Sequence, residues 1–377
     1  MAVSQSVFGE RHAVGLGRRI MLGLRLDAPL LAGLLLTSAF GLVVLWSAGG
    51  QDPGLLMRQL VRLGVAFAVL LAVAQVPPKV LRLWSPWLFL AGLLLLVAVL
   101  VAGDVGKGAQ RWLDLGVVRF QPSEIMKLAM PMMAAWYLHN RPLPPRFVEV
   151  LVLLALVIFP ALMIARQPDL GTALLVASSG LLVLLLGGLR LRYITLFGAL
   201  GAALAPVLWH FMHDYQRRRV LTFFNPESDP LGAGYHIIQS KIAIGSGGLF
   251  GKGWGNGSQA QLEFLPERST DFIFAVLGEE FGLLGLALLM LMYLLLVGRG
   301  LFIALQAQDT YTRLLAGSIS LTFFVYVFVN TGMVTGLLPV VGVPLPLVSY
   351  GGTSMVTLMA GFGILMAING HRNLLAR

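Results

Sequence analysis

The chain contains no cysteine and few charged residues among its 377 positions. Without cysteine it has no disulfide, no thiol nucleophile and no thiolate ligand for a metal ion. Asp, Glu, Lys and Arg together make up only 12% of the residues, roughly half the share of about 25% found in soluble domains. This scarcity of charge excludes a disordered chain, a nucleic-acid-binding protein and a soluble enzyme.

What the chain has instead is hydrophobic side chains, which account for 57% of its residues, together with 44 glycines. A bilayer core about 30 Å thick is crossed by about 20 mostly apolar residues in a helix. Ten segments meet this description and predict an all-α polytopic membrane protein. They lie at about 28–48, 55–76, 80–102, 122–139, 147–165, 171–188, 190–212, 272–297, 311–336 and 350–370. We expect a basic N-terminal leader over residues 1–27, then a single transmembrane domain over residues 28–377.

The distribution of basic residues predicts the orientation of these spans, because Lys and Arg are enriched in short cytoplasmic loops. With ten spans, both termini lie on the same side of the membrane. If that side is the cytoplasm, the whole net charge of +10 falls on it, and the outer face is neutral in sum. Insertion into the cytoplasmic membrane therefore explains the basic composition, and no nucleic-acid partner is needed.

One predicted connection, residues 213–271 between the seventh and eighth spans, is far longer than the others. Connections in compact proteins usually have about 4–6 residues, and much longer ones are commonly functional. The inner connections are too short to hold a nucleotide-binding domain. We therefore expect the chemistry on the extracytoplasmic side, in or beside this long loop.

Asp271 ends the long loop, directly before the eighth span. One interpretation is a helix N-cap, because an Asp side chain accepts hydrogen bonds from the first helical N–H groups. The other is a carboxylate at the outer membrane surface that acts as a general base on an alcohol, and the two roles are compatible. Glu279 and Glu280 follow about 12–14 Å further along the helix and are interpreted as structural rather than catalytic.

A second cluster opens the fourth span, where Glu124 and Lys127 are neighbours on one helix face. Lys127 lies about 7–8 Å into the helix, and an ionisable residue at this depth indicates a functional site. The alternative is an ion pair that merely neutralises both groups. Before this span, Trp112 is either an anchor at the membrane interface or a platform for a sugar ring beside Arg111. Asp169 is predicted to cap the sixth span.

Two further segments are unusual in composition. A glycine run beside Lys252, residues 245–253, does not match the spacing of a P-loop, so it indicates at most a flexible anion nest. Residues 339–352, between the last two spans, are apolar but contain three prolines. This segment is predicted to be irregular backbone packed against the protein at the outer surface.

A carboxylate, a Lys–Glu pair and several cations thus meet at the outer membrane boundary. They suit a substrate with a phosphate head and an acyl or prenyl tail, the head facing the cations and the tail lying between spans. Pyrophosphate is already a good leaving group, so its displacement needs charge stabilisation and one carboxylate to deprotonate the attacking hydroxyl. A glycosidase instead needs a second carboxyl group to protonate a poor leaving group.

Six blocks of sequence occur in a characteristic order, at residues 108–113, 120–127, 167–172, 239–253, 264–280 and 344–354. On these blocks the chain closely resembles the SEDS family (shape, elongation, division and sporulation), over essentially its whole length after about residue 28. Residues 252–254 and 264–268 are more similar to the rod-shape branch of the family than to its division branch. Two departures are visible: Ser269 occupies a position that is usually His, and residues 257–261 vary a Gly-Thr-Gln-Ser-Gln pattern.

The resemblance implies a peptidoglycan glycosyltransferase that polymerises lipid II, an undecaprenyl-pyrophosphate-linked disaccharide peptide, on the outer face of the cytoplasmic membrane. It assigns the essential aspartate of the family to Asp271 and the buried acid–base pair to Glu124 and Lys127. The implied partners are a class B penicillin-binding protein transpeptidase, other elongation-complex proteins and membrane lipids. No cofactor is certain, although a divalent cation (Mg²⁺ or Mn²⁺) shared by Asp271 and a pyrophosphate is compatible with this chemistry.

In the resulting hypothesis, Asp271 takes a proton from an acceptor 4-hydroxyl, whose oxygen attacks the anomeric carbon of the growing glycan with inversion. The residues expected to bind substrate, chiefly its pyrophosphate, are Glu124, Lys127, Arg111, Trp112, Lys107, Arg217, Arg219, Gln239, Lys241, Lys252 and Ser349. Two alternatives stay open, a lipid II flippase or other transporter and a non-catalytic scaffold that activates its partner enzyme. A transporter would concentrate its charge near the bilayer midplane, and a scaffold would tolerate Asp271→Asn.

Overall fold

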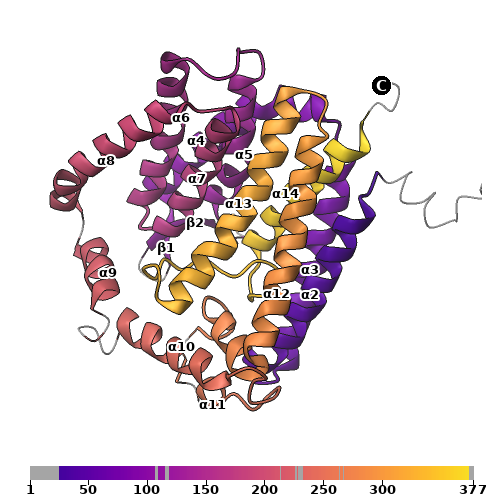
Figure 1. Cartoon of the computed structure of the whole chain (residues 1–377), viewed down its shortest axis with the longest axis vertical. Coiled ribbons are helices and arrows are strands. Elements are labelled where there is room, and N and C mark those ends of the chain that lie inside the picture. The colour runs from indigo at the N-terminus through magenta and orange to yellow at the C-terminus, as the bar shows by residue number, and fades with distance from the viewer. Residues whose placement is uncertain are drawn as a thin grey trace, which may run out of the picture.

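The computed structural model describes residues 25–106, 109–114, 119–212, 214–225, 227, 232–262, 264–265 and 267–372. Ten of the described helices coincide with the ten predicted spans. They are α2 (Ala28–Ala48), α3 (Pro53–Ala74), α4 (Pro78–Ala102), α5 (Pro122–Leu138), α6 (Phe147–Arg166), α7 (Leu170–Leu186), α8 (Leu191–Phe211), α12 (Ile273–Leu305), α13 (Thr310–Thr335) and α14 (Thr353–Gly370). Nine of them pack as a bundle, and α8 is set apart from its centre (Figure 1). Seven of the ten are long and apolar enough to cross a membrane, and α7 and most of α8 are shorter apolar helices. The all-α polytopic membrane fold is confirmed.

Aspartates begin several of these helices, as their side chains favour. The carboxylates of Asp27, Asp52 and Asp309 each accept a hydrogen bond from a backbone N–H in the first turn of α2, α3 and α13, respectively. Asp169 does the same for α7, through the N–H of Thr172 at 3.1 Å. The predicted capping role of Asp169 is therefore confirmed.

Helix α12 is broken at Gly282, where the backbone has φ 65° and ψ −161°. The break divides the predicted eighth span into a short half-helix before Gly282 and a long helix after it. The N–H groups of Leu283 and Leu284, freed by the break, donate to the carbonyls of Gly248 and Leu249 at 3.0 and 3.2 Å. The residues predicted as a flexible glycine run therefore occupy the break in the helix.

The segment predicted as one long loop contains three helices, α9 (Asp214–Phe224), α10 (Ala233–Gly247) and α11 (Ser258–Gln261). Figure 1 shows α10 and α11 at one end of the bundle and α8 and α9 set apart from its centre. Helix α10 packs on α12 and α13, and the hydroxyl of Ser240 donates to the Val334 carbonyl at 2.7 Å. Burial against these neighbours, which the sequence does not reveal, stabilises helices in a polar and glycine-rich segment.

Three short strands precede α5 and were not predicted from the sequence. β1 (Asp104–Gly106) pairs antiparallel with β2 (Ala109–Asp114), and β2 pairs antiparallel with β3 (Arg119–Phe120). The irregular backbone predicted for residues 339–352 is confirmed, because no helix or strand lies between α13 and α14. Several apolar side chains of this segment are buried, namely those of Val343, Leu345, Leu347 and Val348.

Candidate active site

Asp271 lies in a turn that immediately precedes α12. The turn is closed by the N–H groups of Thr270 and Phe272, which donate to the carbonyl of Glu267 at 3.1 and 3.3 Å. The N-cap of α12 is Phe272, and this cap makes no side-chain hydrogen bond. The predicted N-cap role of Asp271 is therefore wrong: the residue precedes the cap, and its side chain is partly exposed.

The backbone just before Asp271 is held by the irregular segment between α13 and α14. The hydroxyl of Ser349 donates to the Thr270 carbonyl at 2.5 Å, and the N–H of Tyr350 donates to the Ser269 carbonyl at 2.8 Å. Ser349 is itself buried. The structure therefore places this predicted substrate-binding residue under the Asp271 turn, where its hydroxyl positions the backbone.

The backbone of Asp271 is also held from α13. The buried amide of Asn330 donates to the carbonyls of Asp271 and Val343, at 3.0 and 2.7 Å. On the side-chain face, Gly342 has φ 73°, and a Cβ added there would lie 3.4 Å from Oδ2 of Asp271. The carboxylate of Asp271 therefore lies beside the backbone of Gly342. The backbone carbonyl of Asp271 is held by a hydrogen bond from α13.

Glu124 and Lys127 form a buried ion pair on α5. Lys127 Nζ lies 2.7 Å from Oε1 of Glu124, and their side chains are only 7% and 6% exposed, respectively. The ammonium group also lies 5.4 Å from the centre of the Tyr326 ring, whereas Oε2 of Glu124 is buried without a hydrogen-bond partner. The prediction that these residues pair on one helix face is confirmed, and Lys127 already has a counter-charge.

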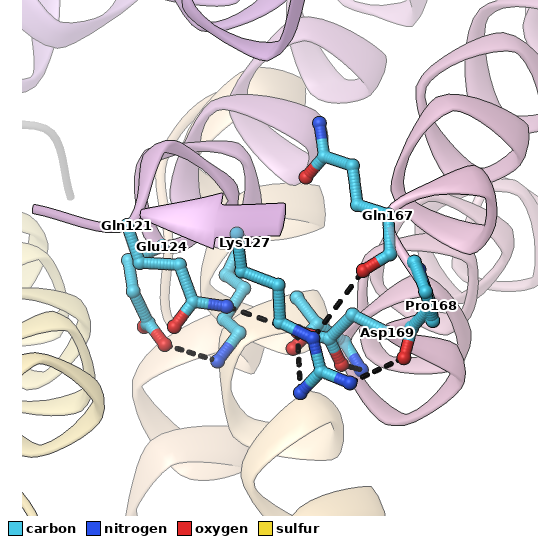
Figure 2. Close-up of polar contacts among 8 residues, drawn as sticks. Gln121, Glu124, Lys127, Gln167, Pro168 and Asp169 are labelled. Carbon is cyan, nitrogen blue, oxygen red and sulfur yellow. Dashed lines mark hydrogen bonds and ion pairs between the residues drawn. The ribbon is translucent and has the colours of Figure 1, made fainter. Parts of the chain in front are cut away.

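Arg111 on β2 joins this region to the start of α7. Figure 2 labels the residues that surround it: Gln121, Glu124, Lys127, Gln167, Pro168 and Asp169. The guanidinium group of Arg111 donates to the carbonyls of Gln167 and Pro168 and lies 4.0 Å from Oδ2 of Asp169. The same carboxylate oxygen accepts a hydrogen bond from Gln121 at 2.9 Å. We refer to Arg111, Gln121, Glu124, Lys127 and Asp169 as the Lys127 cluster.

A small hydrophobic cluster connects the Lys127 cluster with the Asp271 turn. Its buried members are Leu175, Tyr326, Val329 and Val343. Tyr326 contacts the ammonium group of Lys127. The carbonyls of Val343 and Asp271 both accept a hydrogen bond from the side-chain amide of Asn330. The structure therefore connects two groups of residues that are about 100 or more positions apart in the sequence.

Lys252, which was predicted to bind substrate, pairs instead with a carboxylate of the protein. Its Nζ lies 2.7 Å from Oε1 of Glu279 and 2.9 Å from the Ser258 hydroxyl. The carboxylate of Glu279 is fully buried, and Lys252 of the long segment supplies its counter-charge. This is consistent with the structural role predicted for Glu279. Gly247 and Gly251 pack so closely on α12 that an added Cβ would overlap its backbone. The glycine run is therefore a packing surface, and its interpretation as an anion nest is wrong.

The other predicted cations of the long segment have separate surroundings. Arg217 on α9 donates to the carbonyls of Trp209 and His210 at the end of α8, where a helix leaves carbonyls unpaired. Lys241 on α10 is exposed and lies beside Gly336, which ends α13. Neither contact joins these residues to the Asp271 turn, so their substrate-binding roles stay predictions.

Four predicted substrate-binding residues remain, and the structure describes the side chains of two of them. Gln239 on α10 and Trp112 on β2 are both partly exposed. Lys107 lies outside the described residues, and so does the side chain of Arg219 on α9. Asn330 and Tyr326 were not predicted from the sequence, although a polar side chain within an apolar span is itself an indication of a special role.

The described residues do not form a protein metal site. No group of three or more His, Cys, Asp or Glu side chains within the described ranges is placed to hold a metal ion. A divalent cation at Asp271 would therefore take most of its ligands from the substrate or from water.

A family model for cell cycle proteins, the FtsW/RodA/SpoVE model, matches residues 28–374. The chain belongs to this family. It is 56% identical to the peptidoglycan glycosyltransferase MrdB of Escherichia coli K12, over 93% of this chain and 95% of that one. The identity to FtsW of Trichlorobacter lovleyi is 37%, over 91% and 93% of the two chains.

Two solved structures are similar to this fold. One is a chain from a peptidoglycan synthase complex that coordinates polymerization and crosslinking, with a TM-score of 0.79 and 36% identity, covering 91% of this chain and 97% of that chain. The other is the rod shape determining protein RodA of Thermus thermophilus, with a TM-score of 0.70 and 30% identity, covering 92% and 98% of the two chains. The similarity thus extends over nearly the entire bundle.

Proposed function

We propose that this multi-pass membrane protein is a peptidoglycan glycosyltransferase that polymerises lipid II at the outer face of the cytoplasmic membrane, with both of its termini in the cytoplasm. The observation that carries the proposal is the partly exposed carboxylate of Asp271, which lies against the backbone of Gly342. Its peptide is hydrogen-bonded to Asn330. A carboxylate with so fixed a backbone is suited to general base catalysis, in which positioning supplies much of the rate.

In this proposal Asp271 removes the proton from the 4-hydroxyl of the acceptor sugar as its oxygen attacks the anomeric carbon of the donor. The bond from that carbon to the diphosphate breaks, and the configuration of the carbon inverts. The departing diphosphate needs positive charge rather than an acid. Lys127 and Arg111 supply this charge beside the Asp271 turn, and Glu124 orients Lys127 through their ion pair.

The prenyl tail has a suitable place in an apolar groove of about 550 Å³ between α6 and α7. The residues lining it are Leu154, Val157, Ile158, Ala161, Leu162, Ala165, Leu170, Ala173, Leu174, Ala177, Leu181 and Val341. Val341 is directly followed by Gly342, which contacts the Asp271 carboxylate. A tail in this groove would hold its sugar head close to the proposed base.

We further propose a class B penicillin-binding protein transpeptidase as the partner, within an elongation complex. Support comes from the similar chain solved in a peptidoglycan synthase complex. MrdB is the RodA protein of Escherichia coli, so the higher identity to MrdB than to FtsW also favours the rod-shape branch. Polymerised strands need crosslinking, so a transpeptidase beside the polymerase is chemically consistent with this assignment.

The test compares the wild-type chain with Asp271→Asn in a polymerisation assay with purified protein and lipid II, alone and with a class B partner. We expect Asp271→Asn to fold but to lose glycan synthesis by at least about 100-fold, as loss of a general base does. The matched control is Glu227→Gln, which changes an exposed acid of the same long segment and should leave synthesis unchanged. Equal synthesis by Asp271→Asn and the wild type would exclude Asp271 as the base and fit a scaffold. Lipid II movement across vesicles without strands would favour a flippase.

A further inference from the structure

Arg62 is a cation inside an apolar span. It is the tenth residue of α3, so it lies about 13 Å along the helix from Pro53. Arg58 precedes it by four residues and therefore projects from the same face of the helix. Ionisable side chains at such positions are rare in membrane proteins and commonly mark substrate sites.

Both arginines contact Tyr350, in the segment that holds the Asp271 turn. The guanidinium carbon of Arg62 lies 4.3 Å from the centre of the Tyr350 ring, and Nε of Arg58 donates to its hydroxyl at 3.4 Å. The backbone N–H of Tyr350 in turn donates to Ser269, two residues before Asp271. One tyrosine therefore links the two cations to the proposed base, by contacts separate from those of the Lys127 cluster.

Among the described residues, Arg62 has no carboxylate as a counter-charge. Three cations named above each lie within salt-bridge distance of a carboxylate: Lys127 with Glu124, Lys252 with Glu279, and Arg111 with Asp169. Within the described part of the chain, no carboxylate lies within 4.0 Å of Arg62. Arg58 has only a half-exposed pair with Asp52 at 3.5 Å, and exposed pairs of this kind stabilise little.

The contact of Arg62 with the Tyr350 ring leaves its N–H donors available. A cation–π contact uses the charge of the guanidinium group against the ring face, and the N–H donors in the plane of the group can still bind an anion. Arginine binds phosphate oxygens in a bidentate manner, with charge-assisted hydrogen bonds. These properties are suited to binding a diphosphate beside Tyr350.

We propose that Arg62 and Arg58 bind the diphosphate of a polyprenyl-linked sugar, separately from the Lys127 cluster. The inference rests on the proposed function, because that reaction brings two lipid diphosphates, donor and acceptor, to one carboxylate. Two diphosphates repel each other at close range, so two separate groups of cations hold them at a lower electrostatic cost than one group would. The structure offers two cationic sites, each connected to the Asp271 turn from its own side.

The experiment measures the binding of undecaprenyl diphosphate to the full-length protein in detergent, without catalysis. We expect the wild-type protein to bind the probe at two sites. Arg62→Gln should weaken binding at one of them at least tenfold, and Arg62→Lys should weaken it less, because charge is kept but the bidentate geometry is lost. The matched control is Arg166→Gln, which changes an exposed arginine at the predicted outer end of α6 and should bind as the wild type does. Asp271→Asn should also bind as the wild type does.

Steady-state kinetics of polymerisation then identify the bound substrate. A raised KM for lipid II in Arg62→Gln would assign the site to the acceptor, and a lowered kcat with unchanged KM would assign it to the donor diphosphate. Wild-type affinity in a folded Arg62→Gln protein would overturn the inference, even if its thermal stability were lower. If Arg62→Gln does not fold, Arg62→Lys and Arg58→Gln are measured, and wild-type affinity in both would overturn it. Failure of the wild-type protein to bind the probe would instead contradict the proposed function itself.

Discussion

Glu124 and Lys127 show how one buried ion pair contributes both to folding and to chemistry. Removing one member of a buried pair leaves the other charge uncompensated, at a cost of about 3–5 kcal/mol, whereas replacing both is often tolerated. Loss of activity in a single variant therefore does not distinguish a structural role from a functional one. The distinction requires a variant in which the charges are removed together.

We predict that Glu124→Gln and Lys127→Met each lower the midpoint of thermal unfolding in detergent, and that the double variant recovers most of this loss. The double variant should nevertheless form no glycan strands from lipid II, because the cation proposed to stabilise the diphosphate is absent. Unfolding and polymerisation are measured on the same protein preparations. Restored polymerisation in the double variant would show that the Glu124–Lys127 pair has only a structural role.

At the scale of the element, the break in α12 determines where Asp271 is placed. The half-helix before Gly282 carries the Asp271 turn at its start, and the backbone of residues 248–253 fills the break. The N–H groups of Lys252 and Gly253 donate to the carbonyls of Glu279 and Glu280, both at 3.0 Å. The long segment therefore replaces hydrogen bonds that a continuous helix would make within itself.

Gly282→Ala should destabilise the protein by about 2 kcal/mol or more, because its φ and ψ belong to a region essentially restricted to glycine. An added Cβ would also overlap the backbone of Leu249 and Gly251. The control is Gly298→Ala in the same helix, where nothing lies within 4 Å of an added Cβ. That variant should be neutral or stabilised by up to about 1 kcal/mol. Thermal unfolding in detergent measures both, and equal midpoints would contradict the packed break.

At the scale of the whole molecule, Asp27 ties together three helices at the end of the bundle away from Asp271. Its carboxylate caps α2 through Leu30 and accepts two hydrogen bonds from Arg299 of α12, at 3.0 and 2.7 Å. Asn369 of α14 donates to it at 2.8 Å. The first turn of α2 and the last turn of α14 are thus joined at one end of the bundle.

Asp27→Ala should therefore cost more than the loss of a helix cap. We expect about 3–5 kcal/mol, the cost of leaving a partly buried arginine without its counter-charge. Asp309→Ala removes a cap that has the same geometry at α13 and should cost about 1 kcal/mol. Thermal unfolding of the two variants gives the comparison. A similar loss in both would indicate that the contacts of Asp27 with α12 and α14 contribute little.

The sequence by itself determined the positions of ten helices, the pairing of Glu124 with Lys127 and the irregular segment before α14. These features depend on local properties: apolar length, helical periodicity and the backbone restrictions of proline. Only the tertiary structure decided which cations meet the Asp271 turn. It assigned Lys252 to Glu279 and Arg217 to the end of α8, and it brought Arg62 to Tyr350. The reason is physical: whether a charge is compensated depends on which distant residue packs beside it, and no local sequence pattern contains that information.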